Sequence, residues 1–135
     1  MGGPMDEKTF LTAVAERAGL SRGEAADLTR ATLAEIAGQI SGGELDRLSG
    51  VLPDWLGPHV PRHDGQAHPK PVSEAVQGLS KRTGLTEEET RRGAGAVLSV
   101  LSEAVDSREL EHALSMLPHE YRRMSRPEGP PTAGG

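Results

Sequence analysis

The sequence predicts an all-α fold, a compact bundle of six to eight short and medium helices, from three observations. The apolar residues are mostly Leu, Ala and Val, with one Phe, one Trp and one Tyr in 135 residues, which suits helix packing better than a sheet. Glycine, capping and proline signals follow one another at helix-sized intervals. The chain also resembles itself at an offset of 65 residues, which indicates a duplicated helical unit.

The self-similarity aligns residues 10–56 with residues 75–121 without a gap. Ten positions are identical: Arg17/Arg82, Gly19/Gly84, Leu20/Leu85, Glu24/Glu89, Ala31/Ala96, Leu33/Leu98, Glu44/Glu109, Leu45/Leu110, Leu52/Leu117 and Pro53/Pro118. We therefore expect one helical domain over residues 1–135, with a first repeat at about 6–56, a linker at 57–71, a second repeat at about 72–125 and a disordered tail at 126–135. Each repeat alone is too small to bury enough apolar surface. The two three-helix repeats should therefore pack face to face around a pseudo-two-fold axis.

The first helix of each repeat should end at a glycine, because glycine adopts the left-handed conformation of a helix C-terminus without a steric penalty. These glycines are Gly19 and Gly84. A second, long helix then begins with a capping box, in which a hydroxyl residue is followed three positions later by Glu. The two boxes are Ser21–Glu24 and Thr86–Glu89.

A third, short helix should follow the caps that begin at Ser41 and Asp106 in the two repeats. Pro53 and Pro118 then end this helix or open one more turn.

Gly93 and Gly95 stand in the middle of the second long helix, where each interior glycine costs about 0.5–1 kcal/mol relative to alanine. Close approach of another helix would explain them. A tolerated weak turn near the helix start is the alternative.

Composition excludes several function classes. The net charge is -5, and Lys and Arg alternate with Glu and Asp, so we expect no nucleic-acid binding. The absence of cysteine excludes disulfides, thiolate zinc sites and cysteine nucleophiles. No apolar run is long enough to span a membrane and the N-terminus lacks the order of a secretory signal, which predicts a cytoplasmic protein. The 12 Arg against 3 Lys are typical of GC-rich bacterial genomes.

The linker GPHVPRHDGQAHPKP holds the metal-ligand candidates His59, His63 and His68 beside Asp64. Imidazoles and a carboxylate suit zinc, nickel or copper. Four prolines and two glycines interrupt the segment, however, which favours a solvated connector with incidental histidines. Further along, Glu109 and His112 lie three positions apart, as in half of a carboxylate–histidine metal site or in an ordinary surface pair.

Trp55 and Tyr121 follow the Leu-Pro ending of each repeat and should either plug the ends of the core or, if one is exposed, anchor a partner. We favour the plug. Arg122 and Arg123 beside Tyr121 could bind an acidic partner or a phosphate, although a solvated face also explains them. These four residues are the partner-binding candidates.

No nucleophile, base and orienting group can be named together, so we expect neither an enzyme nor a cofactor. The sequence favours a non-enzymatic helical protein-interaction module that binds another protein or itself. The alternative is a small-molecule or metal-binding protein that uses the inter-repeat cavity or the His-bearing linker.

The order FLTAVAERAGLSRGEAADLTRATLAEIAGQISGGELDRLSGVLP, with a divergent second copy ending AVLSVLSEAVDSRELEHALSMLPHEYR, resembles the bacterial domain of unknown function 2267 family over about residues 6–125. The resemblance implies a compact bundle of short helices in two copies. It brings no established activity, substrate or functional residue. The second copy departs from the pattern at Gly93 and Gly95, where the first has Leu28 and Arg30.

Overall fold

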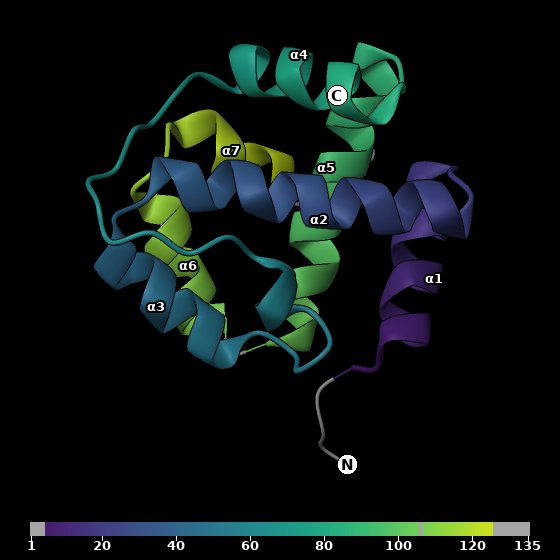
Figure 1. Ribbon diagram of the computed structural model, residues 1–135. Helices are drawn as coiled ribbons and strands as arrows, with labels where there is room; N and C mark the ends of the chain where they lie inside the picture. Colours follow the sequence, from purple (N-terminus) through teal and green to yellow (C-terminus); the bar gives the residue numbers. More distant parts are fainter. Residues whose placement is uncertain (1–4, 106, 126–135) are drawn as a thin grey trace, which may run out of the picture.

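The computed structural model describes residues 5–105 and 107–125, without the side chains of Ser107, Arg122 and Ser125. This part of the chain forms seven α-helices and one 3₁₀ turn and contains no strand, which confirms the all-α prediction (Figure 1). The elements are α1 (Glu7–Ala18), α2 (Arg22–Gln39), α3 (Gly42–Val51), η1 (Gly57–His59), α4 (Val72–Thr83), α5 (Glu87–Ala104), α6 (Ser107–Ser115) and α7 (His119–Ser125). The predicted cap Asp106 and the predicted tail at 126–135 lie outside the described residues.

The predicted helix ends are confirmed by local geometry. Gly19 and Gly84 have φ angles of 70° and 81°, in the left-handed region that glycine adopts freely. Both capping boxes, Ser21–Glu24 and Thr86–Glu89, are closed in both directions, with N–H···O distances between 2.9 and 3.1 Å. The Ser41 hydroxyl accepts the Glu44 N–H at 3.3 Å at the start of α3. Each of these helix starts therefore satisfies a backbone donor that has no intrahelical acceptor.

Helix bounds recur along the chain. α1 and α4 span residues 7–18 and 72–83, and α2 and α5 span residues 22–39 and 87–104, so both pairs are 65 residues apart. α1 packs on α2 and on α5, while α4 packs on α5 and on α2. Each first helix thus lies against the long helix of its own half and that of the other half. One buried cluster consequently runs from Phe10 to Tyr121.

Gly93 and Gly95 lie where other helices approach α5 most closely. A methyl group on Gly93 would collide with the Leu28 side chain of α2 and lie 3.3 Å from Leu20 Cδ1. A methyl group on Gly95 would lie 2.6 Å from the main-chain oxygen of Met124 in α7. The close-approach explanation of the two glycines is confirmed, since α2 and α7 occupy the space that side chains would need.

No helix in the described part of the chain is long and apolar enough to cross a bilayer.

We expect Gly95→Ala to lower the free energy of unfolding by about 1–3 kcal/mol, because the new methyl group must displace a backbone carbonyl in a packed region. Urea unfolding followed through the fluorescence of the single tryptophan, Trp55, measures the change. Gly78→Ala is the matched control: Gly78 is an exposed interior residue of α4 with open space around it. This control should gain about 0.5–1 kcal/mol. Equal gains from both substitutions would contradict the tight contact between α5 and α7.

Candidate functional site

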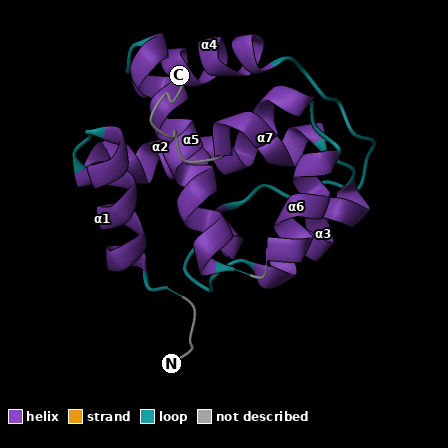
Figure 2. Cartoon of the chain, turned by 180° about the vertical axis from the view of Figure 1, so that it is seen from behind, coloured by secondary structure: helices purple, strands orange, loops and turns teal. Residues whose placement is uncertain are grey.

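An open groove of about 990 Å³ lies between α1 and α7, with α5 as its floor. Figure 2 shows α1 and α7 on opposite sides of α5. The groove is lined by Arg17 of α1, by Glu88, Arg91, Arg92, Gly95, Ala96, Ser99 and Glu103 of α5, and by Glu120, Arg123 and Met124 of α7. Its walls come from opposite ends of the sequence, and the floor joins them.

The floor follows one face of α5. Its positions recur every three or four residues between Glu88 and Glu103, as expected for one side of an α-helix. At a rise of about 1.5 Å per residue, this face is roughly 22 Å long. Gly95, Ala96 and Ser99 are small and buried, because Met124 of α7 packs against Gly95 and Arg17 Nη1 donates to Ser99 Oγ.

Two arginines of the groove hold α1 against α5. Arg17 donates from Nη1 to Ser99 Oγ at 3.0 Å and from Nη2 to Glu103 Oε1 at 2.9 Å. Arg92 donates from Nε to the main-chain oxygen of Ala18 at 3.1 Å, which satisfies a carbonyl at the C-terminus of α1. These contacts join the first half to the second and fix the guanidinium groups in place.

The other two arginines are available. Arg91 and Arg123 are exposed and, in the described part of the chain, form neither an ion pair nor a hydrogen bond within the protein. Glu88 and Glu120 on the rim are exposed as well. The groove therefore presents two unpaired guanidinium groups on a rim of mixed charge.

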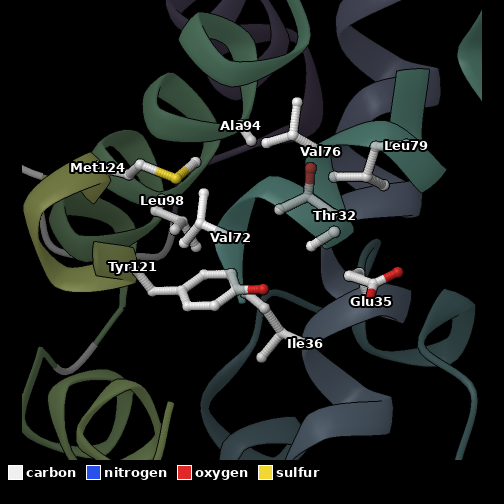
Figure 3. Close-up of a pocket in the computed structure, with 11 residues that line it drawn as sticks. Thr32, Glu35, Ile36, Val72, Val76, Leu79, Ala94, Leu98, Tyr121 and Met124 are labelled. Carbon is white, nitrogen blue, oxygen red and sulfur yellow. The ribbon is translucent and has the colours of Figure 1, made fainter. Parts of the chain in front are cut away.

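A separate small cavity of about 10 Å³, room for about one water molecule, lies between α2, α4, α5 and α7 (Figure 3). Most side chains that line it are apolar, with Thr32, Glu35 and Tyr121 among them, and Thr32 Oγ1 is buried without a hydrogen-bond partner in the described part of the chain. Met124 lines the cavity and also the groove. The cavity is too small for an organic ligand.

Tyr121 is a core residue with 4% exposure. Its hydroxyl accepts Gln39 Nε2–H at 2.8 Å and donates to the Lys70 main-chain oxygen at 3.3 Å. Gln39 Oε1 in turn accepts the Lys70 N–H at 3.1 Å. The side chain joins α7 to α2 and to the linker, so it presents no surface to a partner.

Trp55 is half-buried and packs edge-on against Phe10, with ring centroids 5.1 Å apart. Its Nε1–H donates to the Met5 main-chain oxygen at 3.1 Å. Tyr121 is thus part of the buried core, and Trp55 packs against that core. Of the four partner-binding candidates, only Arg123 lines the groove; Arg122 lies in α7 with its side chain outside the described part.

The linker histidines are not brought together. His63 Nδ1 accepts the Gly65 N–H at 3.0 Å, so its Nε2 carries the proton and donates to the oxygens of Ala37 and Ile40 at 2.9 and 3.1 Å. His63 therefore caps the C-terminus of α2, and both of its ring nitrogens are used. His59 and His68 are exposed.

No group of three or more potential ligands that could hold a metal gathers among the described residues. The metal interpretation of the linker thus lacks a geometric basis. The favoured interpretation was wrong for His63, which is a structural residue and not an incidental one.

His112 reaches across to the other half. Its Nε2 is 3.1 Å from Glu44 Oε2, which also accepts Arg47 Nη1–H at 3.0 Å. Glu44 is buried and joins α3 to α6 through this contact, so the predicted pairing of His112 with Glu109 is replaced by a contact between helices.

No local pattern in the sequence marks Arg17, Ser99 and Glu103 as groove residues. Arg17 belongs to the repeated pattern at the end of the first helix, and its acceptors lie 82 and 86 positions away. Arg91 and Arg92 form a basic pair directly before Gly93, which is a local indication of a charged surface there.

We expect His63→Ala to lower the free energy of unfolding by about 1–2 kcal/mol, because two helix-terminal carbonyls lose their donor. His59→Ala and His68→Ala serve as controls and should change it by less than about 0.5 kcal/mol, since both side chains are exposed. Urea titrations of the three variants measure the differences. Three equal effects would contradict the capping role.

Tyr121 should make stability sensitive to alkaline pH. Burial raises the pKa of its phenol above the ordinary 10.0, and the carboxylates of Glu35, Glu120 and Glu74 add to the rise, against the lowering by the Gln39 hydrogen bond. Because the pKa of Tyr121 is higher in the folded chain than in the unfolded chain, the protonated phenol stabilises the fold. This stabilisation is fully present below about pH 10 and is lost as the pH rises through the folded pKa.

The chain has one tyrosine, so tyrosinate absorbance of the native protein reports this pKa directly. Its midpoint should lie above 10.0, and Tyr121→Phe should remove this part of the loss of stability at high pH. A native midpoint at or below the ordinary value would contradict the buried placement.

Comparison with known proteins gives one family. The model of the uncharacterized conserved protein family DUF2267 matches residues 7–124, nearly the whole length of the described structure. No curated protein matches the sequence. Because the match covers all seven described helices with the exception of the last residue of α7, the chain belongs to the DUF2267 family.

Proposed function

We propose that this protein is a non-enzymatic helical module that binds another protein, or a second copy of itself, through the groove between α1, α5 and α7. The groove supports the proposal because it combines an open volume of about 990 Å³ with Arg91 and Arg123, two exposed guanidinium groups that have no partner in the described chain. Arginine is enriched at protein interfaces, where its planar group binds carboxylates.

The groove lies where the halves differ. The polar α5 residues that line it are Glu88, Arg91, Arg92, Ser99 and Glu103, and their counterparts 65 positions earlier are Gly23, Ala26, Asp27, Ala34 and Gly38. None of the counterparts is an arginine. The helix framework recurs in both halves, whereas these side chains do not, which is the pattern expected when one copy keeps only a structural role.

We also propose that the halves are related by a pseudo-two-fold axis at the crossing of α2 and α5. Leu28 and Gly93 are equivalent in the 65-residue alignment, and a methyl group on Gly93 would meet the Leu28 side chain. Equivalent residues touch one another only close to such an axis. At this axis two equivalent large side chains would collide. Leu28 on α2 opposite Gly93 on α5 would avoid that collision and let the two helices pack closely.

Photo-crosslinking from defined positions tests the binding function. A photoreactive phenylalanine analogue placed at Glu88 or at Glu120, on the groove rim, should yield the same discrete protein adduct in the cell of origin. The analogue at Lys81 of α4 or Glu111 of α6, which are exposed and lie outside the groove, should yield none. Absence of an adduct from both rim positions, or adducts from the control positions alone, would refute a function based on this groove.

A further inference from the structure

The linker contains the one Asp-Gly pair of the chain, Asp64–Gly65, and the chain has no asparagine. In such a pair the main-chain nitrogen of glycine can attack the preceding carboxyl carbon and close a five-membered imide ring, because glycine has no Cβ to hinder its nitrogen. The reaction requires a carboxyl group that is free to turn and a base that removes the proton of the amide nitrogen. The structure meets both conditions at this pair.

The Asp64 carboxyl group is free. It is exposed and forms no hydrogen bond or ion pair with the described part of the chain. The main chain beside it is held in place, since the Gly65 oxygen accepts the Gly42 N–H at 3.1 Å. Gly42 also packs so tightly on this segment that a methyl group on it would collide with the His63 main-chain oxygen. The carboxyl group can therefore turn toward a nitrogen that is itself fixed.

His63 is placed as the base. Its Nδ1 accepts the Gly65 N–H at 3.0 Å, and its Nε2–H donates to the main-chain oxygens of Ala37 and Ile40 at 2.9 and 3.1 Å. Carbonyl groups at a helix C-terminus stabilise the imidazolium that forms when Nδ1 takes up a proton. They also fix the ring, as the third member of a catalytic triad orients its histidine.

The base and the carboxyl group approach the Gly65 nitrogen from different directions. An N–H proton lies in the plane of its peptide group, so His63 removes it within that plane. The electron pair that then attacks the carboxyl carbon points out of the plane, toward one face of the peptide group. Asp64 Cγ can approach from that face, and neither group blocks the other.

We propose that Asp64 is a site of self-modification, at which His63 acts as the general base for ring closure onto the Gly65 nitrogen and the residue is converted to isoaspartate. This inference is independent of the function proposed for the groove. It requires no co-reactant except water.

The reaction has two steps, in which Asp64 first reacts as the protonated acid. The bond from the Gly65 nitrogen to Asp64 Cγ forms while the N–H proton moves to His63 Nδ1. This proton then leaves with the Cγ hydroxyl group as water, which gives the imide. Water next adds to the main-chain carbonyl of Asp64 and breaks its bond to the Gly65 nitrogen, so that the main chain now passes through Cγ.

The product alters the joint between α2 and α3. The additional main-chain atom moves Gly65 relative to two fixed groups, the His63 ring and the Gly42 N–H, to which it is bonded in the unmodified chain. The modified chain should therefore unfold at a lower urea concentration than the unmodified chain.

The experiment incubates the folded protein at a pH between the ordinary pKa values of a carboxyl group and an imidazole, so that the protonated acid and the neutral base coexist. Isoaspartate is measured by transfer of a labelled methyl group with a protein isoaspartate methyltransferase, and it is located by electron-transfer fragmentation. The imide is detected as the loss of one water. Isoaspartate should accumulate at position 64 at least about tenfold faster than in the same chain unfolded in urea, because general bases contribute about 10²–10⁴-fold.

His63→Gln is the decisive variant. A glutamine amide can still donate to the helix carbonyls and accept the Gly65 N–H, but it cannot take up the proton. This variant should form isoaspartate at least about tenfold more slowly than the native chain. The matched controls are His59→Gln and His68→Gln, whose exposed side chains are remote from this hydrogen bond; both should react within about twofold of the native rate.

A second variant leaves His63 in place. A methyl group on Gly65 would lie 3.6 Å from His63 Nδ1, which is an ordinary contact, so Gly65→Ala keeps the fold and the base. Its branched Cα hinders the attacking nitrogen, and the modification should slow severalfold. Urea titrations of all variants show that each is folded under the conditions of the incubation.

Four outcomes would overturn the inference. These are no isoaspartate at position 64 in the native chain, a rate in His63→Gln equal to or above the native rate, an equal loss of rate in His59→Gln, and faster reaction in the unfolded chain than in the folded one. The last outcome would mean that the fold protects Asp64 and does not activate it.

Discussion

The crossing of α2 and α5 is the contact on which the other helix positions depend. The Leu28 side chain occupies the space that a side chain at position 93 would need, so the two longest helices touch over a large residue on one side and bare backbone on the other. α1 and α4 each pack against both long helices, α2 and α5, and one buried cluster joins the two halves. Both walls of the groove, α1 and α7, pack on the same helix, α5, that crosses α2.

The parts of this fold that the sequence could predict have causes within a few residues. The left-handed glycines at 19 and 84 and the capping boxes that follow them depend on local geometry, and all appear where expected. The interior glycines of α5 could be predicted to face another helix, because only a close neighbour offsets their cost. His63 could not be assigned, since its acceptors at Ala37 and Ile40 are more than 20 positions away and its linker has no periodic pattern. The groove was hidden for the same reason: its residues gather only once α1 lies on α5.

The two halves of the chain share the lengths of their first two helices, whereas the residues of the groove differ between them. The first long helix has Ala26 and Asp27 where the second has Arg91 and Arg92, and the second has glycine at positions 93 and 95, where α2 and α7 approach it. Gly95 also lines the groove, so the glycine that lets α7 pack on α5 belongs to the same surface as Arg91 and Arg123.

The origin of the groove walls in α1 and α7 has a consequence for the life of the chain in the cell. During synthesis the first wall emerges at once, but no second wall exists until residues up to Met124 have left the ribosome and docked on α5. On the proposed function, a partner that touches both walls would bind only a chain in which α7 has docked on α5, and a nascent or truncated chain without α7 would lack half of the site.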